Sequence, residues 1–400
     1  MPASYDFIII GAGIVGLTVA RELLSRYPRA SIAVLDKEQK PGIHASGRNS
    51  GILHSGIYYA KDTLKAKVCS RGANLLYEFS REHGIDCNKN GKVILATSED
   101  QLPTMDTLVR NAKTNNIKAD KIDNKHLLEI EPFARPALSA IYCPDTAAID
   151  SQAVMDTLYR LLMKDGVKFI FSCKLLALTS TDEISTSSGV FSYGYLFNCA
   201  GAYADKIAHM DSTALEYALV PFKGTYWKLA EHARHKVRGN IYPAPDINMP
   251  FLGVHLSRTI SNEVYAGPTA IPALGRENYG VLSDLKFNEA FPIVGKLCKM
   301  YIKNKNNFRA FSHTEISKYF KSRFIKELKT LVTRIESDDL VPTSKTGIRP
   351  QLINSKTGEL EMDYIIKRTI NKLHVLNAIS PAFTSSFAFA EIIVNKSETI

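Results

Sequence analysis

A glycine-rich turn near the start of the chain is the feature that most limits how it can fold. Residues 5–10 form a short apolar run rich in isoleucine, and residues 11–16, Gly-Ala-Gly-Ile-Val-Gly, come directly after it. Such a run indicates a buried parallel strand, and the apolar spacing over residues 14–25 predicts a helix after the turn. Residues 31–35 then alternate as a strand and end on Asp36. This stretch therefore predicts one β-α-β unit.

Each glycine of the turn has a separate task in a dinucleotide-binding unit. Gly11 permits the tight turn, Gly13 lets a pyrophosphate approach the backbone, and Gly16 lets the helix pack on the strand. The helix N-terminus attracts phosphate charge, and Asp36 at the end of the second strand would accept hydrogen bonds from a ribose. The alternative is a glycine-rich turn without a ligand. We expect three neighbours to contact the same cofactor: Ile14, Val15 and Lys37.

The choice between NAD and FAD depends on the segment that comes after this unit. An NAD dehydrogenase would continue into another β-α crossover. Residues 41–59 are instead rich in glycine, serine and small hydrogen-bond donors, with two histidines and two tyrosines. That composition suits a segment that wraps an isoalloxazine ring, so we predict FAD. The residues of this segment expected to contact FAD are Ser46, Arg48, Asn49, Ser50 and Gly51.

The cofactor signals lie at the start, middle and end of the chain. We predict an α/β chain, α+β overall, in which a mixed-sheet substrate domain is inserted into a Rossmann-type FAD-binding domain. The FAD-binding domain would comprise residues 1–84, 145–216 and 342–400, and the substrate domain residues 85–144 and 217–341. Further strands are predicted at residues 92–97, 168–171, 195–198, 241–242, 264–266 and 373–376, and helices at residues 64–83, 151–164 and 381–396.

Several segments carry a family resemblance. The run from Asn49-Ser50-Gly51 to His54-Ser55-Gly56-Ile57-Tyr58-Tyr59 is similar to the flavin-proximal segment of the L-2-hydroxyglutarate oxidase/dehydrogenase family, within the D-amino-acid oxidase superfamily of FAD-dependent oxidoreductases. The other matching segments are residues 64–67, 221–224, 241–243, 250–256, 267–268, 347–349 and 380–382, so the resemblance covers nearly the whole chain. Arg48 departs from it, because the family has histidine there. This departure bears on the substrate more than on the cofactor.

The resemblance implies oxidation of an L-2-hydroxy acid, most specifically L-2-hydroxyglutarate, to a 2-oxo acid, with hydride passing to flavin N5. It also implies that Ala200 and Gly201 form a second cofactor strip and that Leu175 contacts the adenine. Pro381 and Ala382 would lie beside the flavin. With Ser380 as N-cap and Pro381 at the first helical position, the helix would present its positive end to the anionic reduced ring.

Two residues are expected to act on the hydroxy acid. Arg349, in a Gly-Ile-Arg motif, offers a planar two-point grip for a carboxylate, and the alternative is a surface ion pair. His54 is the expected proton acceptor, because an imidazole pKa near ~6.5 suits a base at neutral pH. The alternative for His54 is a hydrogen bond to the flavin without a proton role. His255 is the substitute base, or a core histidine.

The second carboxylate of L-2-hydroxyglutarate needs another cation. Arg276, Lys65, Lys67 and Arg48 are available, and Arg276 is the expected one. Tyr58 and Tyr59 would hydrogen-bond the substrate or pack beside the flavin. His44 allows a covalent histidyl-flavin bond as an alternative to non-covalent FAD. An amine or amino-acid oxidase and a non-catalytic flavoprotein of the same fold are the rival functions.

Charge gathers in one part of the chain. Of a net charge of +10, residues 295–334 carry eleven Lys or Arg against Glu315 and Glu327. Apolar side chains are interleaved with this charge, namely Leu297, Phe308, Phe311, Tyr319, Phe320, Phe324 and Leu328. This pattern predicts either docking on an anionic membrane surface, with a quinone rather than oxygen as electron acceptor, or an ordinary solvated helical face. No nucleic-acid-binding module accompanies the charge, so we expect no nucleic acid partner.

The remaining composition points to the cytoplasm. The six cysteines are scattered without the two-residue gap of metal sites and redox dithiols, so we expect no metal and buried thiols in a reducing compartment. No apolar run approaches the ~20 residues of a membrane span. The first residues leave no room for a signal peptide before the first strand, so we expect a cytoplasmic protein, peripheral on the inner face of the membrane if it docks there.

Overall fold

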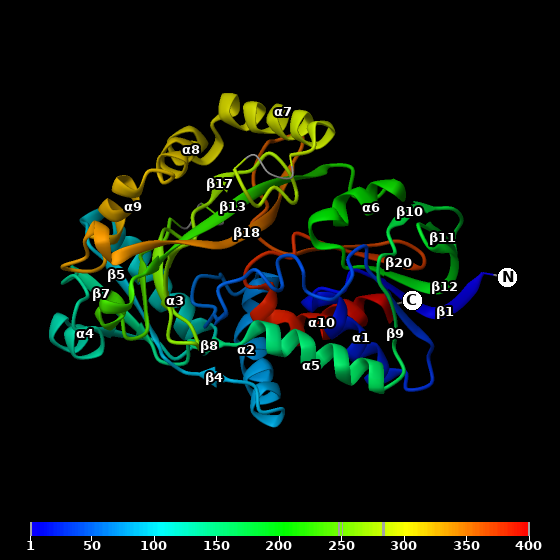
Figure 1. Cartoon of the computed structure of the whole chain (residues 1–400), viewed down its shortest axis with the longest axis horizontal. Helices are drawn as coiled ribbons and strands as arrows, with labels where there is room; N and C mark the ends of the chain where they lie inside the picture. The colour runs from blue at the N-terminus through cyan, green and yellow to red at the C-terminus, as the bar shows by residue number, and fades with distance from the viewer. Residues whose placement is uncertain (1, 247–248, 250, 282–284, 399–400) are drawn as a thin grey trace.

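Two large sheets form the body of the protein. The computed structural model describes residues 2–246, 249, 251–281 and 285–398. Within them, one sheet has eight strands and the other has nine, and a third sheet is formed by β3 (Ile52–Leu53), β4 (Cys87–Asn88) and β8 (Ala147–Ile149). The first sheet occupies the right of Figure 1 and the second sheet the left.

The first sheet is built around the β-α-β unit predicted from the glycine-rich turn. β1 (Ala3–Ile10) pairs in parallel with β2 (Ile32–Leu35) on one side and with β12 (Gly189–Asn198) on the other, and α1 (Ile14–Arg26) joins β1 to β2. The other strands of this sheet are β9 (Lys168–Ile170), β10 (Leu175–Leu178), β11 (Glu183–Thr186), β19 (Ile365–Arg368) and β20 (Lys372–Leu376). The sheet thus draws on the start, middle and end of the chain.

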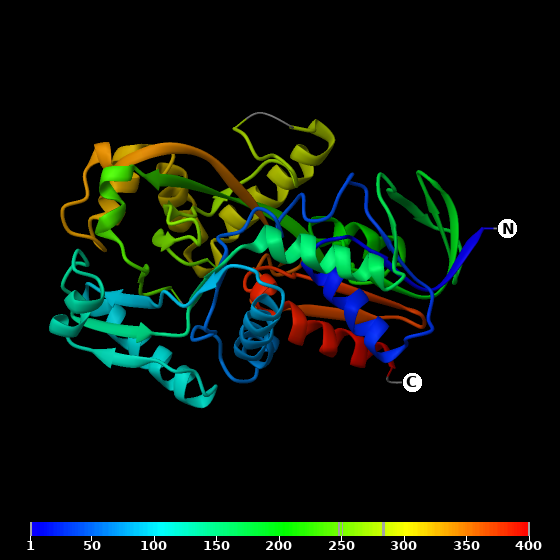
Figure 2. The same cartoon turned by 60° about the horizontal axis from the view of Figure 1, so that its bottom comes forward.

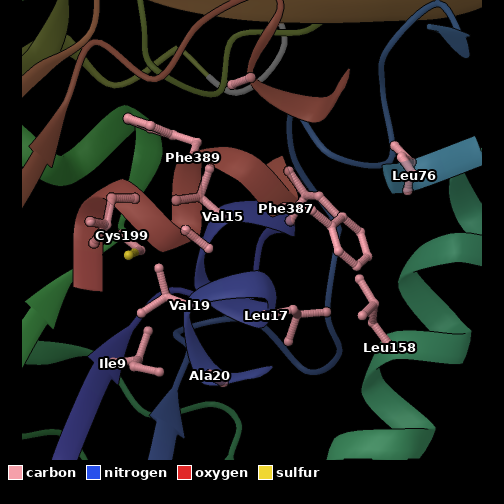
Figure 3. Close-up of a cluster of buried hydrophobic side chains, with 14 of the residues drawn as sticks. Ile9, Val15, Leu17, Val19, Ala20, Leu76, Leu158, Cys199, Phe387 and Phe389 are labelled. Atoms are coloured by element: carbon pink, nitrogen blue, oxygen red, sulfur yellow. The ribbon is translucent and has the colours of Figure 1, made fainter. Parts of the chain in front are cut away.

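Four helices pack together against the first sheet: α1, α2 (Leu64–Glu82), α5 (Ser151–Lys164) and α10 (Ala382–Glu398). Figure 3 shows Leu17 of α1, Leu158 of α5 and Phe387 of α10 in one buried cluster. A Cβ on Gly72 of α2 would lie only 2.6 Å from Cα of Ser385 in α10, so these two helices meet at backbone distance. This packing holds the N-terminal ends of α1 and α10 in fixed positions.

The second sheet is mixed and contains the two longest strands. β13 (Tyr217–Leu229) and β18 (Leu340–Asn354) pair antiparallel along most of their length and extend toward the first sheet (Figure 2). The other strands are β5 (Lys92–Ala96), β6 (Asp120–Ile122), β7 (Ser139–Cys143), β14 (Asn240–Pro243), β15 (His255–Arg258), β16 (Val264–Gly267) and β17 (Ile271–Pro272). Helices outside the first core include α3 (Leu102–Thr114), α4 (Asn124–Ile130) and α6 (Ala204–Met210).

The basic segment folds as three helices along the upper edge of Figure 1: α7 (Phe287–Lys303), α8 (Phe308–Ser317) and α9 (Lys321–Leu328). Membrane docking was predicted from seven apolar residues interleaved with the charge, but most of these side chains do not face outward. Phe308, Phe324 and Leu328 are buried. Leu297 and Phe311 are half-buried against apolar residues of β13. Only Tyr319 and Phe320 are exposed. These helices cover apolar residues beneath them, so most of their own apolar side chains must face inward.

The last helix begins one residue later than predicted. The Ser385 N–H donates to the carbonyl of Pro381 at 2.9 Å, so Pro381 rather than Ser380 is the N-cap. The Ala382 N–H donates to the carbonyl of Ile379 at 2.8 Å. This bond closes a turn in front of the helix, and Ser380 lies inside that turn.

Two other expectations concern thiols and membrane spans. All six cysteines are free, but Cys298 is exposed on α7 and Cys87 is half-buried, so the expectation of buried thiols is wrong for these two. Cys298 is exposed because it lies on the outer face of its helix. Among the described residues, no helix has both the length and the apolar character needed to cross a bilayer.

Candidate active site

A cavity of about 990 Å³ lies where the two halves of the molecule meet. Residues of the glycine-rich turn line one part of it, and His255 of β15 and Arg349 of β18 line another. Ligand sites commonly have volumes of roughly 300–1,000 Å³. This cavity therefore has room for a large ligand.

The glycine-rich turn has the geometry expected of a phosphate cradle. Gly11 has φ +108°, and a Cβ there would lie 2.5 Å from the carbonyl oxygen of Cys199. A Cβ on Gly16 would lie 1.9 Å from the carbonyl oxygen of Gly11, so strand and helix meet without space for a side chain. At Gly13 a Cβ would meet only the Ser46 hydroxyl, at 3.1 Å. The backbone at Gly13 is thus open to the cavity, at the N-terminus of α1.

Asp36 and Ser46 hold this turn in place. The Asp36 carboxylate accepts hydrogen bonds from the N–H groups of Ala12 at 2.6 Å and Glu38 at 2.9 Å, and the Ser46 hydroxyl accepts from the N–H of Ile14 at 2.9 Å. All the residues expected to contact the cofactor line the cavity except Gly16 and Gly51: Gly11, Gly13, Ile14, Val15, Asp36, Lys37, Ser46, Arg48, Asn49, Ser50, Leu175, Ala200, Gly201, Pro381 and Ala382.

Gly16 and Gly51 support the site from behind. Gly16 sets the contact between α1 and β1. Gly51 has φ +70°, and a Cβ there would lie 2.8 Å from the carbonyl oxygen of Ile149. This arrangement fits FAD: the backbone at Gly13 is open, an acidic residue directly follows β2, and the N-termini of α1 and α10 lie beside one large cavity.

A charged cluster closes part of the cavity beside this turn. The Lys37 ammonium donates to Glu38 and, at 2.6 Å, to Glu277, while His44 lies 2.9 Å from Glu38 through Nε2 and 2.7 Å from the Tyr279 hydroxyl through Nδ1. Burial alone would raise the pKa of Glu277. The hydrogen bonds that its carboxylate accepts, among them the one from Lys37, outweigh burial and bring this pKa to about 2. Glu38, His44 and Glu277 are close enough to share a metal ion, but Lys37 already supplies positive charge there.

Arg349 lies in the cavity wall without an acidic partner. It sits on β18 opposite Phe222 of β13. One guanidinium nitrogen, Nη1, donates to the carbonyl of Thr269 at 3.1 Å, and the group lies 5.8 Å from the centre of the Phe251 ring. No carboxylate in the described part of the chain forms an ion pair with it. Burial lowers the pKa of Arg349, yet an arginine remains charged.

His54 and His255 also line the cavity. Burial, with a contribution from the nearby charges of Lys92 and Arg349, lowers the pKa of His54 to about 3. Burial likewise brings the pKa of His255 to about 3. Both imidazoles are therefore neutral at pH 7. His255 Nδ1 lies 2.8 Å from the carbonyl of Gly253, which places the proton on Nδ1 and leaves Nε2 as an acceptor.

A buried lysine supports the tyrosines expected near the substrate. Lys92 is 1% exposed, and its ammonium donates to the Tyr58 hydroxyl at 3.2 Å and lies 5.2 Å from the centre of the Tyr242 ring. Tyr242 in turn stacks on His255 with ring centres 3.8 Å apart. Tyr58 and Tyr59 both line the cavity. The sequence analysis did not identify Lys92. A lysine at the start of the apolar strand Val-Ile-Leu-Ala could have indicated a buried charge there.

Two of the cations considered for the second carboxylate differ in their surroundings. The Arg276 guanidinium donates to both carboxylate oxygens of Asp205 and to the carbonyl of Ala202, so its charge is balanced although it lines the cavity. Lys65 also lines the cavity and is 4% exposed, and it has no such partner among the residues that the structure describes.

Comparison with known proteins places these features in a family. The family model for FAD dependent oxidoreductases matches residues 6–396. The chain belongs to this family. It is 36% identical over 396 residues to "L-2-hydroxyglutarate dehydrogenase" of Indibacter alkaliphilus, covering 96% of each chain, and 33% identical over 416 residues to the human mitochondrial protein of that name, covering 98% of this chain and 89% of that one.

Solved structures agree on the fold. The FAD-bound L-α-glycerophosphate oxidase of Mycoplasma pneumoniae is similar with a TM-score of 0.79 at 19% identity, covering 99% of this chain and 95% of that one. Glycine oxidase of Geobacillus kaustophilus is similar with a TM-score of 0.72 at 17% identity, covering 99% and 96%. The protein is thus an FAD-dependent oxidoreductase with a D-amino-acid oxidase-like fold, which confirms the predicted fold class and cofactor.

Proposed function

We propose that this enzyme oxidises L-2-hydroxyglutarate to 2-oxoglutarate. The observation that carries the proposal is the Arg349 guanidinium, which faces the cavity without a carboxylate of the described chain to balance it. A half-buried cation without an acidic partner is stabilised when an anionic ligand joins it. The relatives named above supply the identity of that anion, because their names specify L-2-hydroxyglutarate.

The glycine-rich turn, Asp36 and Ser46 would hold FAD at the first sheet, with Pro381 and Ala382 at its flavin end. When bound there, FAD supplies a two-electron acceptor for the hydrogen on C2 of the substrate. The protein's own contribution is to bind the substrate, orient C2 and accept the hydroxyl proton.

Arg349 holds the carboxylate next to the reacting carbon. The Thr269 carbonyl takes a hydrogen bond from Nη1 and so fixes the plane of the guanidinium. The remaining donors of the fork can bind both oxygens of one carboxylate. This grip stops rotation of the substrate about its long axis and keeps the C2 hydrogen pointed at the cofactor.

His54 accepts the hydroxyl proton as the C2 hydrogen leaves with its electron pair and the carbonyl forms. The imidazole is neutral before the reaction, because burial holds its pKa at about 3. The carboxylates of a bound substrate would raise that pKa and improve the base. His255 is the second candidate, since its Nε2 is already unprotonated through the bond from Nδ1 to Gly253. Tyr58, held by Lys92, would donate to the substrate.

Anaerobic reduction of the flavin by a panel of acids tests the proposal. The panel contains L-2-hydroxyglutarate, L-lactate, L-glutamate, glycine and L-α-glycerophosphate, and loss of the yellow colour of oxidised FAD is the readout. We expect L-2-hydroxyglutarate to reduce the flavin fastest. Faster reduction by an amino acid would make the enzyme an amino-acid oxidase, and reduction by none would favour a non-catalytic flavoprotein.

We also propose that the enzyme is cytoplasmic and docks on the anionic inner face of a membrane through α7 and its neighbours. Phe287, Phe291 and Ile302 of α7 are 69%, 74% and 72% exposed. With Val294 and Cys298 they recur every three or four residues and so form one outward stripe along α7. The other exposed apolar side chains nearby are Tyr301, Ile316, Tyr319 and Phe320.

The charges around this stripe are of one sign. Within residues 285–335, the acidic residues Glu289, Glu315 and Glu327 are buried or half-buried and ion-paired with lysines. The exposed charged residues of the same stretch are all basic: Lys286, Lys299, Lys303, Lys305, Arg309, Arg323, Lys326, Lys329 and Arg334. Each basic residue near an anionic bilayer contributes about 1 kcal/mol, screened by salt. An anionic lipid surface therefore complements this face.

Co-sedimentation with vesicles tests the docking. We expect binding to vesicles that contain phosphatidylglycerol, weaker binding at high salt, and little binding to phosphatidylcholine alone. The double variant Phe287→Ser, Phe291→Ser should reduce binding, whereas Ile370→Ser, at an exposed site between β19 and β20, is the control. Absence of binding at low salt would remove the proposal. Turnover with a soluble quinone or with oxygen then decides between the two electron acceptors.

A further inference from the structure

Lys65 is a buried ammonium that reaches the cavity without a partner in the described chain. It lies in the first turn of α2, which Thr63 caps through a hydrogen bond from the N–H of Ala66. Its Nζ atom lies 5.6 Å from the ring centres of both Tyr59 and Tyr364. No hydrogen-bond acceptor or carboxylate in the described residues contacts this ammonium. Burial of an unpaired charge is unfavourable, so such a group calls for an anion.

The nearest acidic residue has another task. The Asp363 carboxylate accepts hydrogen bonds from the backbone N–H groups of Leu64 at 2.6 Å and Lys65 at 3.0 Å. The N–H of Tyr364 donates to it as well, at 2.8 Å. Asp363 thus satisfies the open N–H groups at the start of α2 rather than the ammonium of Lys65. Its charge still favours protonated Lys65 from a distance.

Most other cations that line the cavity are already engaged. Arg276 is paired with Asp205, Lys37 with Glu277, and Lys206 with Glu289. Arg48 stacks over the Tyr279 ring at 4.1 Å and donates to the carbonyl of Ile43, on an exposed part of the rim. Arg349 and Lys65 therefore differ from these four residues: both lie in the cavity wall, and neither pairs with an acid of the described chain.

We infer that Lys65 binds the second carboxylate of the substrate and makes the enzyme selective for dicarboxylic over monocarboxylic 2-hydroxy acids. The inference rests on the proposed function, in which Arg349 holds the first carboxylate. An ammonium on a flexible stem suits a terminal carboxylate, since three donors can reach it from several directions. The Tyr59 ring, with its centre 5.6 Å from Nζ of Lys65, lies beside this pair. Lys65 thereby replaces Arg276 in the role that we expected from the sequence.

Substrate comparison with two lysine variants tests the inference. Lys65→Met removes the charge but keeps most of the length of the side chain. Lys67→Met is the matched control, because Lys67 is exposed on the same helix. L-2-hydroxypentanoate has the same carbon chain as L-2-hydroxyglutarate without the second carboxylate. We expect Lys65→Met to lower kcat/KM for L-2-hydroxyglutarate about ten- to a hundred-fold. It should leave L-2-hydroxypentanoate within about two-fold. Lys65→Arg should recover part of the loss.

A binding measurement separates this inference from the proposed function. Calorimetric titration of the FAD-loaded enzyme with glutarate and with pentanoate needs no turnover. We expect Lys65→Met to weaken glutarate about ten- to a hundred-fold and pentanoate hardly at all. Failure of the wild-type enzyme to oxidise L-2-hydroxyglutarate would sink the proposed function alone. An equal loss for both ligands, or a Lys65→Met protein with altered flavin absorbance or FAD content, would overturn the role of Lys65.

Discussion

Arg349 carries a charge that nothing else in the described protein balances. The Thr269 carbonyl accepts one of its hydrogen bonds, but a neutral carbonyl leaves the charge itself unpaired. A substrate carboxylate would complete the pair through charged hydrogen bonds, which are stronger than those to a neutral carbonyl. The residue therefore links the electrostatics of the cavity to recognition of an acid.

Substitution of Arg349 should separate substrate binding from cofactor binding. Arg349→Lys keeps the charge but loses the planar fork. Because a charged hydrogen bond contributes roughly 1.5–3 kcal/mol, we expect kcat/KM for L-2-hydroxyglutarate to fall about ten-fold or more. In Arg349→Ala, kcat/KM should fall further. Because the grip also aligns C2, kcat should fall with it. FAD content should stay unchanged, and Arg323→Lys on the exposed face of α9 should have no effect. Wild-type kinetics in both Arg349 variants would contradict its role.

The sequence made Arg349 and His54 candidates because both stand in segments that resemble those of the family, and the structure places both in the cavity wall. It was not sufficient to choose between Arg276 and Lys65. That choice depends on Asp205, which is 71 positions away from Arg276 in the chain and meets it only in the folded molecule. Ion pairs between distant segments leave no local pattern, so the charge state of a cavity emerges from the structure alone.

The buried charges also predict a pH profile for kcat/KM on L-2-hydroxyglutarate. Burial brings the pKa of His54 to about 3, so this base stays unprotonated and active as the pH falls through about 6.5, where an ordinary histidine gains a proton. Burial lowers the pKa of Lys65 to about 8. Its ammonium is present below that pH and is lost above it. We expect a flat profile from about pH 5 to 7 and a decline past about pH 8.

The tyrosines and the thiol beside Lys65 do not titrate in that range. Burial raises the pKa of Tyr59 and of Tyr364, and burial brings the pKa of Cys69 to about 12. The alkaline decline should therefore be absent in Lys65→Met. An acidic limb near pH 6.5 that disappears in His54→Gln would show instead that His54 has an ordinary pKa.

Among the elements, the turn between β1 and α1 makes the strictest demand on residue type. A valine at Gly13 would place its Cβ 3.1 Å from the Ser46 hydroxyl and its methyl groups in the space that a pyrophosphate needs. We expect Gly13→Val to purify without the yellow colour of FAD, as measured by absorbance of the heat-released cofactor. Gly295→Val, at a helical position where a Cβ meets nothing within 4 Å, should keep full FAD content. A yellow Gly13→Val protein would refute the cradle.

Elements with strong local periodicity could be predicted, and those shaped by distant contacts could not. The helix predicted at residues 151–164 has those bounds in α5. The two longest strands, β13 and β18, were not predicted, because prolines and glycines such as Pro221, Gly224 and Gly347 interrupt their pattern. Pairing between the two strands overrides that local weakness. The same pairing carries Arg349 into the cavity wall.

On the scale of the whole molecule, the site depends on how the two halves are joined. Arg276 comes after β17 of the second sheet and pairs with Asp205 of α6, which packs on β12 and β20 of the first sheet. Both side chains are nearly buried. The division into FAD-binding residues 1–84, 145–216 and 342–400 and substrate-domain residues 85–144 and 217–341 stays a prediction, which proteolysis of the loaded enzyme can test.

Loss of the Arg276–Asp205 pair should weaken this junction. Arg276→Met leaves a buried carboxylate without its partner, so we expect the free energy of unfolding in denaturant to fall by about 3–5 kcal/mol. Arg71→Met breaks the exposed pair with Glu391 and should cost no more than about 1 kcal/mol. A stable Arg276→Met protein that loses turnover of dicarboxylates but not of monocarboxylates would return Arg276 to the substrate site.

Anaerobic titration of the purified enzyme with the two enantiomers of 2-hydroxyglutarate tests the central claim most directly. We predict that the L-enantiomer reduces the bound FAD completely and yields one 2-oxoglutarate for each flavin reduced, because the Arg349 grip and His54 present only one face of C2 to the cofactor. The D-enantiomer should leave the flavin oxidised. If L-2-hydroxyglutarate leaves the flavin oxidised while another hydroxy or amino acid reduces it, the claim is contradicted.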